Sequence, residues 1–285
     1  MKNGQSRWSV KSARFNKRKE KTMPLAENDL MKIVHELLEA EATCCPIDEI
    51  SKRYPGMTID DAYAVQIKTI EEKVKAGSVV VGRKIGLTSK AMQALIGIDE
   101  PDFGIIVDSK VYREGEAISA GSMMVPRIEA EIGFLLKEDL KGPGVNVVNV
   151  LAATAGVMPL LEVKDTRLKT LKPNIIDAIA DNATSGIVIL GGKLTPLTAD
   201  IDLRLVGMIF EQNGEIMSTA TGAEALGNPA EPVAWLANKM ASYGITLKKG
   251  EFIMSGGLTK ALEVKPGSSF KATFDRLGSV SSLFK

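Results

Sequence analysis

The chain has 285 residues, 45% hydrophobic and 25% charged, values ordinary for a soluble globular protein and sufficient for a sizeable core. No apolar stretch approaches the roughly 20 residues that span a bilayer, so we expect no membrane segment. The single histidine, His35, lies in an expected helix, which excludes His-based catalytic triads and HExxH metal chemistry. Cys44 and Cys45 are neighbours, which predicts free thiols in a cytoplasmic, reducing compartment and no zinc site.

The N-terminus differs in charge from the rest of the chain. The first 22 residues hold eight Lys or Arg against one acid, Glu20, although the net charge of the whole chain is only +1. Such an arm could bind nucleic acid or target an organelle. We instead predict a disordered extension over residues 1–24, or a natural start at Met23. The remaining body is acidic and has no nucleic-acid motif, so no nucleic-acid partner is expected.

Helical spacing of apolar residues comes first along the body. Residues 28–43 show it with Asn28 as a plausible N-cap. A second helix is predicted to begin after Thr58, which precedes an acid at the third helical position, and to end near Gly77. Residues 25–78 are therefore predicted to form a small helical N-terminal segment.

The pattern then changes to short β runs punctuated by glycine. The predicted strands lie at 79–82, 103–107, 131–136, 157–163, 186–190, 203–210, 251–254 and 270–274. Asn213-Gly214 predicts a type I′ hairpin, and one helix is expected from Asn228 to Gly244. Many β runs with few helices predict an α+β fold, a mixed β-roll or barrel over residues 79–285 with a small helical N-terminal part.

Two glutamates on one predicted strand are the most informative feature. Glu129 and Glu131 are two residues apart, so both carboxylates lie on one face of the strand. Glu162 lies in a second apolar run. Three carboxylates among strands, with almost no histidine, favour an oxygen-preferring ion such as Mg²⁺ or Mn²⁺. The alternative is that the acids are solvated on an exposed sheet face.

Four other segments could line a site, although each is weak alone. Lys84 lies in an apolar strand between glycines and is either a surface lysine or a buried base or anion partner. Asp102 stands in a turn at the entry to a strand. The small polar segment 180–186 precedes an apolar strand, and the glycines of 254–259 let backbone amides approach an anion.

Together and in order, these segments resemble the hydratase/decarboxylase branch of the fumarylacetoacetate hydrolase superfamily. The resemblance covers about four-fifths of the chain. It is carried by the segments VVGRKIGLTSKAMQ, EPDFGIIVDS, PRIEAEI, VMPLLEVKDTR, ADNATSG and GNPAEPVAWLANKM. The family fold is a mixed β-roll catalytic domain with a smaller helical N-terminal part, in agreement with the pattern above.

The resemblance also implies residue roles. The metal ligands of the family fall on Glu129, Glu131 and Glu162, and its catalytic residues on Lys84 and Asp102. The predicted substrate-binding residues are Arg83, Thr88, Asp181, Asn182, Thr184, Ser255 and Gly256. The implied reaction is metal-dependent addition of water to 2-hydroxypenta-2,4-dienoate, giving 4-hydroxy-2-oxopentanoate, in catabolism of aromatic compounds. Which of Lys84 and Asp102 activates the water stays open.

Competing functions share the same metal site. Decarboxylation of 4-oxalocrotonate is the main alternative, and Asp102 favours the hydratase because adding water needs a positioned acid or base. Hydrolysis of an acylpyruvate C–C bond ranks lower, since it commonly uses a His–Glu pair, and a non-enzymatic binding module ranks last. The resemblance further implies a homo-oligomer, with a possible complex with a pathway decarboxylase or aldolase.

Overall fold

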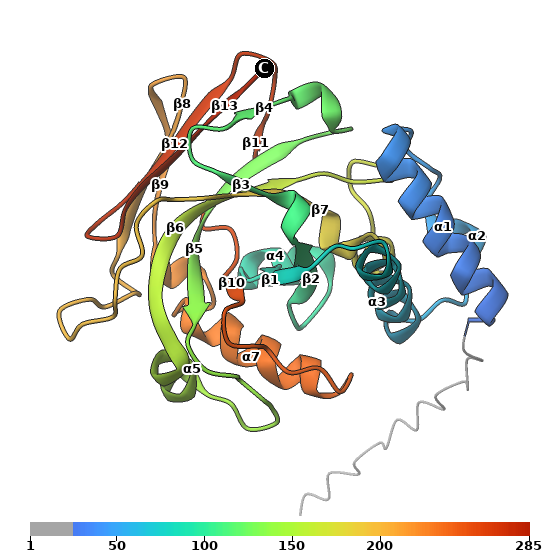
Figure 1. Ribbon diagram of the computed structural model, residues 1–285, viewed down its shortest axis with the longest axis horizontal. Coiled ribbons are helices and arrows are strands. Elements are labelled where there is room, and N and C mark those ends of the chain that lie inside the picture. The colour runs from blue at the N-terminus through green and yellow to red at the C-terminus, as the bar shows by residue number, and fades with distance from the viewer. Residues whose placement is uncertain (1–24) are drawn as a thin grey trace, which may run out of the picture.

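The computed structural model describes residues 25–285, whose strands form two sheets (Figure 1). The eight-stranded sheet has the order β2-β1-β10-β5-β6-β7-β3, with β11 beside β5, and the five-stranded sheet the order β4-β13-β12-β8-β9. The strands are β1 Val80–Gly86, β2 Asp102–Val107, β3 Val111–Arg113, β4 Ala117–Ile118, β5 Arg127–Leu136, β6 Thr154–Lys164, β7 Ser185–Leu190, β8 Gly207–Gln212, β9 Glu215–Thr221, β10 Phe252–Met254, β11 Leu262–Glu263, β12 Ser269–Phe274 and β13 Gly278–Phe284. The predicted disordered arm, residues 1–24, lies outside the described residues.

Helices cover the ends and one side of the sheets (Figure 1). They are α1 Glu27–Thr43, α2 Ile50–Arg53, α3 Ile59–Lys75, α4 Lys90–Ile96, α5 Val147–Ala153, α6 Ile175–Ala180 and α7 Ala230–Ala241. The capping box predicted at Thr58 is confirmed, with Asp61 as its partner. Asn28 as N-cap is wrong: α1 begins at Glu27 without a side-chain cap.

The larger sheet curls into a roll. Its two edge strands, β2 and β3, are joined by a single 3₁₀ turn, Asp108–Lys110, so the chain itself holds the edges close together. Within residues 25–285 the edges do not pair with each other, so the sheet is a roll and not a closed barrel. The predicted α+β roll with a small helical N-terminal part is therefore confirmed.

The two faces of the rolled sheet pack against different partners. The outer face contributes Ile128, Ala130 and Ile132 to the main core, which also takes in the smaller sheet and the helices. The inner face has its own apolar cluster, formed by Ile106, Met158, Leu160, Val188, Phe252 and Met254. Because strand side chains alternate, any polar residue in register with the inner cluster must lie inside the roll.

Helix α3 fixes the start of β2. The buried Gln66 amide donates to the carbonyls of Phe103 (2.8 Å) and Ile179 (3.0 Å). The ring of Tyr63 stacks on that of Phe103 with centroids 4.3 Å apart. These contacts join the helical part to the strand that begins at Asp102.

Most predicted strands are confirmed, with two kinds of error. The strand predicted at 203–210 begins only at Gly207, and β13 was missed because its serine-rich sequence carries little apolar alternation. The short strands β3, β4 and β11 and the short helices α2, α4, α5 and α6 were also missed. The Asn213-Gly214 hairpin is confirmed: both residues have positive φ, as a type I′ turn requires, and join β8 to β9.

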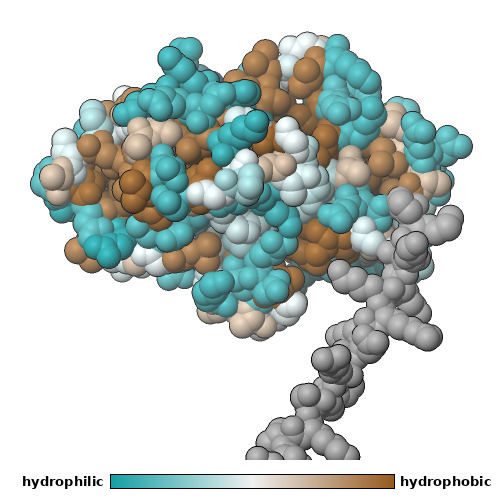
Figure 2. All heavy atoms as spheres, turned by 90° about the horizontal axis from the view of Figure 1, so that it is seen from below, coloured by the Kyte–Doolittle hydropathy of each residue, from teal (hydrophilic) through white to brown (hydrophobic). Residues whose placement is uncertain are grey.

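Hydrophobic and hydrophilic side chains are interspersed over the face in Figure 2. No helix within residues 25–285 combines the length and apolar character needed to cross a bilayer.

The capping box supports a stability prediction. In α3 the Thr58 hydroxyl accepts from the Asp61 N–H at 3.1 Å, and the Asp61 carboxylate accepts from the Thr58 N–H at 2.9 Å. We expect Thr58→Ala to lower the free energy of unfolding by about 1 kcal/mol, measured by urea denaturation. Thr58→Ser keeps the hydroxyl and is the matched control; equal stability of the two variants would contradict the cap.

Candidate metal and active site

Strands β5 and β6 bring three carboxylates together inside the roll. Glu129 pairs directly with Glu162 in the antiparallel register, and Glu131 pairs with Leu160. Directly opposed residues share a face, so all three acids point to the side of the inner apolar cluster. One oxygen from each of Glu129, Glu131 and Glu162 lies within 4.8 Å of the others.

The three carboxylates repel one another in a buried place. Glu131 has no exposed surface and Glu162 is 2% exposed. Burial, and then the charges of Glu162 and Glu129, raise the pKa of Glu131 well above its ordinary value. Without a cation, ionising all three carboxylates at once is therefore costly. Burial of an unbalanced charge is costly, so a positive ion bound between the three carboxylates would lower that cost.

The free lone pairs also fit a metal ion. Glu131 Oε2 accepts a hydrogen bond from the Gly256 N–H at 2.8 Å, while Glu131 Oε1 is buried and accepts none from any described residue. Gly256 has φ +105°, a conformation that favours glycine, and a Cβ there would lie 2.1 Å from Thr88 Oγ1. The backbone therefore orients Glu131 and leaves one oxygen open. A buried set of three carboxylates of this kind can bind a divalent cation.

Lys84 lies on the same inner face, from the neighbouring strand β1. It is 2% exposed, and its Nζ lies 2.7 Å from Glu162 Oε1. Its second contact is with the carbonyl oxygen of Ala183 at 2.6 Å. The Ala183 contact is a hydrogen bond that uses one of the three N–H donors of the ammonium group, and the Glu162 contact is an ion pair. A Cβ at Gly104 would lie 2.9 Å from Lys84 Cγ, so the glycine makes room for the lysine.

A strained turn presents the Ala183 carbonyl to Lys84. Asn182, Ala183 and Thr184 all have φ near +53°, a region that residues other than glycine seldom adopt. The Asn182 side chain stabilises the turn by accepting from the Ile105 N–H (2.8 Å) and donating to the Ile105 carbonyl (2.9 Å). Backbone strain held in this way is common at functional sites.

Asp102 completes the inner face at the first position of β2. It pairs with Gly86, two residues beyond Lys84 on β1, so its side chain lies on the same face as Lys84. It is 4% exposed, and its Oδ1 accepts no hydrogen bond from any described residue. Burial raises the pKa of Asp102, and the positive charge of Lys84 offsets this only in part. This carboxyl group can therefore hold a proton that an exposed aspartate would lose.

Some of the remaining predicted substrate-binding residues lie near Glu131, and others point away from the carboxylates. Thr88 and Gly256 lie against each other beside Glu131, and Ser255 is fully buried, with its N–H bonded to the Ile132 carbonyl at 3.1 Å. Arg83 is not brought to the site. It alternates with Lys84 along β1, and its Nη2 pairs with Glu251 Oε1 at 3.3 Å on the other face.

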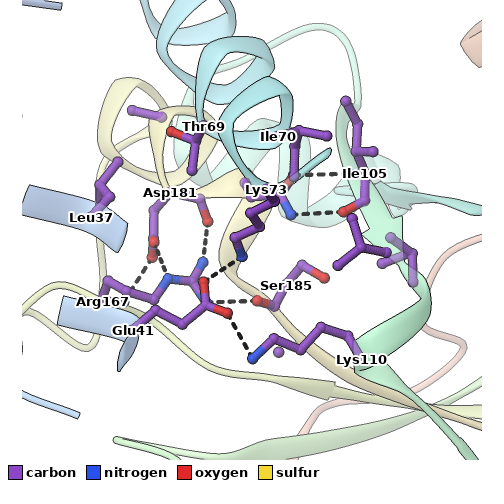
Figure 3. A pocket seen from close by; sticks show the side chains of 15 residues that line it. Leu37, Glu41, Thr69, Ile70, Lys73, Ile105, Lys110, Arg167, Asp181 and Ser185 are labelled. Carbon is purple, nitrogen blue, oxygen red and sulfur yellow. Dashed lines mark hydrogen bonds and ion pairs between the residues drawn. The ribbon is translucent and has the colours of Figure 1, made fainter. Parts of the chain in front are cut away.

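Asp181 also points elsewhere, into a charged cluster between the helices and the roll (Figure 3). Its carboxylate bonds to the Arg167 guanidinium and to the Thr166 hydroxyl (2.8 Å). In the same cluster Glu41 contacts Lys73 and, at 2.7 Å, Lys110. Burial alone would raise the pKa of Glu41, but the neighbouring cations lower it to about 2. These charges satisfy one another, so Asp181 holds the fold together and does not face the carboxylates.

Thr184 contributes its backbone to this region. Its carbonyl accepts from the Asp165 N–H at 2.9 Å, and its own N–H donates to the Asp181 carbonyl at 3.0 Å. The predicted segment 180–186 thus supports the site through the turn that carries Ala183. Its polar side chains are mostly used within the fold.

One charged residue of the site was missed in the sequence. Lys164 Nζ lies 2.6 Å from Glu129 Oε1. Burial by itself would lower the pKa of Lys164, but the charges of Glu129 and Glu162 outweigh burial and raise it. The signal was available, because Lys164 follows Glu162 by two residues on the same strand and must share its face.

Comparison with known proteins places this site in a family. The family model described as "Fumarylacetoacetate (FAA) hydrolase C-terminal" matches residues 78–284. A 4-oxalocrotonate decarboxylase from Pseudomonas sp. (strain CF600) is 40% identical over 91% of this chain and 98% of its own length. A 2-keto-4-pentenoate hydratase from Paraburkholderia xenovorans is 40% identical over 87% of this chain and 92% of its own.

A solved structure agrees over nearly the whole chain. It is the 4-oxalocrotonate decarboxylase from Pseudomonas putida G7 complexed with magnesium and adipate, 37% identical in sequence. The TM-score is 0.89, covering 92% of this chain and 99% of that chain. The similarity thus extends through the helical N-terminal part as well as the roll.

The repulsion among the carboxylates makes a testable prediction about metal binding. We expect Mg²⁺ or Mn²⁺ to raise the melting temperature of the wild type; a site filled at 100 times its Kd would add about 2.7 kcal/mol of stability. Glu131→Gln should remove this shift. Without metal the variant should be at least as stable as the wild type, because one of three repelling charges is gone.

The matched control for that experiment is Glu215→Gln, at an exposed position of β9. It should keep the metal-induced shift in thermal denaturation. A Glu131→Gln variant that still responds to metal like the wild type would rule out Glu131 as a ligand.

Proposed function

Since the chain belongs to the fumarylacetoacetate hydrolase family, we propose that it is a metal-dependent hydratase that adds water to 2-hydroxypenta-2,4-dienoate to give 4-hydroxy-2-oxopentanoate. Both this reaction and the decarboxylation of 4-oxalocrotonate are lyase reactions. The observation that carries the choice of hydratase is Asp102: a buried carboxyl group with a raised pKa and a free oxygen, on the same face as Lys84 and the three glutamates.

The proposed metal is Mg²⁺ or Mn²⁺, held by Glu129, Glu131 and Glu162. Three carboxylates leave the other positions of a six-coordinate ion to water or substrate. A 2-oxo acid fits those positions through one carboxylate oxygen and the adjacent ketone oxygen. When bound, the ion acts as a Lewis acid that stabilises negative charge developing at the 2-oxo group.

The protein side chains would supply the proton transfers. The dienol first loses the proton of its 2-hydroxyl group and gains one at C5, which gives the conjugated ketone 2-oxopent-3-enoate. Water oxygen then bonds to C4, and a proton is added at C3. Asp102 and Lys84 are the groups placed to give or accept these protons. Lys84 is held by an ion pair with Glu162 and a hydrogen bond to the Ala183 carbonyl, and its ammonium group would still have an N–H for the substrate.

The alternatives need other groups. Loss of CO₂ needs chiefly an electron sink, so a decarboxylase would have little use for a proton-holding acid at Asp102. A hydrolase of the acylpyruvate type would need a base such as histidine, and His35 is exposed on α1. A binding module would not need an acid and a lysine beside the metal ligands. Assembly as a homo-oligomer, a complex with a pathway decarboxylase or aldolase, a cytoplasmic location and a role in aromatic catabolism are part of the same proposal.

A paired assay tests the reaction. Purified enzyme is given 2-hydroxypenta-2,4-dienoate and, separately, 4-oxalocrotonate, each with and without EDTA. We expect hydration of the dienoate that EDTA abolishes. Asp102→Asn should lower the rate of hydration by about 10²- to 10⁴-fold, the usual contribution of a general acid or base.

Asp99→Asn is the control, because Asp99 is exposed and only three residues from Asp102. It should hydrate the dienoate at the wild-type rate. Release of CO₂ from 4-oxalocrotonate without hydration of the dienoate would overturn the hydratase proposal and support the decarboxylase.

A further inference from the structure

The turn that contacts Lys84 lies against a free edge of the roll. In the part of the chain that the structure describes, strand β2 is an edge strand and pairs only with β1. The Asn182 side chain bonds both backbone groups of Ile105 on β2, accepting from the N–H at 2.8 Å and donating to the carbonyl at 2.9 Å. An amide side chain has a donor and an acceptor, as a strand backbone has. Asn182 thus takes the place of a neighbouring strand at this point.

The backbone of the turn also packs tightly on β2. A Cβ at Gly104 would lie 2.6 Å from the Asn182 carbonyl oxygen and 2.9 Å from Lys84 Cγ. The turn and the lysine side chain therefore cover the same glycine, and neither could keep its place if the strand carried a side chain there. The position of the turn relative to β2 and the position of Lys84 are linked.

A second residue holds the turn from the side of the helices. The Arg167 guanidinium donates to the carbonyls of the two residues that flank the turn, Asp181 and, at 2.6 Å, Ser185 (Figure 3). Arg167 is 6% exposed, and its Nε pairs with the Asp181 carboxylate. The turn is thus held at both ends by Arg167 and at its first residue by Asn182.

The held turn decides where the Lys84 ammonium group points. A lysine side chain is a flexible stem of four methylene groups. Here Nζ lies 2.6 Å from the Ala183 carbonyl oxygen and 2.7 Å from Glu162 Oε1. If the turn moved away from β2, the ammonium group would keep only Glu162, which is itself a proposed metal ligand. Its direction toward the substrate would then be less well defined.

We propose that Asn182 is a positioning residue for Lys84: its two hydrogen bonds to Ile105 hold the 182–184 turn against β2, and the Ala183 carbonyl then fixes the direction of the ammonium group. Asn182 acts through the lysine and does not itself touch the substrate. The inference rests on the proposed function for the catalytic role of Lys84. Misplacing a group that acts on the reacting atoms should lower kcat more than it raises KM.

Asn182→Gly tests this role, because glycine adopts the left-handed conformation readily and the change removes only the side-chain bonds. On the full-length, metal-loaded enzyme we expect kcat to fall by about 10- to 100-fold, with KM within about threefold of the wild type. Asn182→Asp keeps an acceptor for the Ile105 N–H but loses the donor for the Ile105 carbonyl. Its kcat should lie between those of the wild type and the glycine variant.

Asn174→Gly is the matched control. The Asn174 side chain also makes two hydrogen bonds, with the Asp177 N–H (3.0 Å) and the Ser51 hydroxyl (2.7 Å), but at the start of α6. Its loss should lower stability in urea denaturation and leave kcat at the wild-type value. If Asn174→Gly lowered kcat as much as Asn182→Gly, loss of stability would explain both variants and the positioning role would be rejected.

A double-mutant cycle separates positioning from a general effect on the fold. In a Lys84→Met background there is no ammonium group to orient, so adding Asn182→Gly should lower kcat by no more than about twofold. A further loss of about tenfold or more in that background would overturn the proposal.

Hydrogen exchange adds a measurement that needs no turnover. The Ile105 amide, which now donates to Asn182, should exchange faster in Asn182→Gly than in the wild type. Exchange at the wild-type rate would mean that Asn182 does not hold the turn on β2, and would also overturn the proposal.

Failure of the proposed function gives a different result. Rates are measured with 2-hydroxypenta-2,4-dienoate and with 4-oxalocrotonate. If only the second reacts, the hydratase assignment fails, and the same variants test the dependence of Lys84 on Asn182 through the release of CO₂. If hydration is observed and Asn182→Gly keeps the wild-type kcat, the positioning role fails and the hydratase stands.

Discussion

Mutual repulsion among Glu129, Glu131 and Glu162 is the constraint on which the inner face of the roll depends. The β5–β6 register forces the three carboxylates together, and burial removes the water that would screen them. The neighbouring donors and cations offset part of this repulsion. Lys84 approaches Glu162, Lys164 approaches Glu129, and a backbone N–H donates to Glu131. The two lysines pair with Glu162 and Glu129, and Glu131 has no cation partner among the described residues, so the cluster favours a further cation.

Close approach around the carboxylates depends on small residues and on one strained turn. Any Cβ at Gly257 would lie 2.4 Å from Glu129 Oε2, and one at Gly104 would meet both Lys84 and the Asn182 carbonyl. The positive φ angles at 182–184 aim a carbonyl at the lysine, and Asn182 holds them by bonding to β2. Close backbone approach and strained backbone angles thus occur where the charged side chains are held in place.

Part of the fold and of the candidate site could be predicted because strand alternation, helix capping and hairpin turns each depend on residues close in sequence. Three predictions each depend on residues a few positions apart: that Glu129 and Glu131 share a strand face, the capping box at Thr58 and the Asn213-Gly214 hairpin. Glu162 was recognised as the third acid because it lies in a second apolar run, and the resemblance assigned it to the metal. Strand alternation does not predict the register between β5 and β6. Only the structure shows that Glu162 lies directly opposite Glu129. The serine-rich β13 was missed because its sequence carries little apolar alternation, although it packs against β6 and β7.

The same local rule helps to explain why two of the predicted substrate-binding residues lie away from the carboxylates. Arg83 neighbours Lys84 in sequence and was grouped with it, yet adjacent strand residues face opposite sides, and its partner is Glu251. Asp181 lies close in sequence to the turn that contacts Lys84, but it is held by Arg167. The resemblance covers whole segments, whereas the direction of each side chain depends on strand alternation and on the partner that the side chain binds.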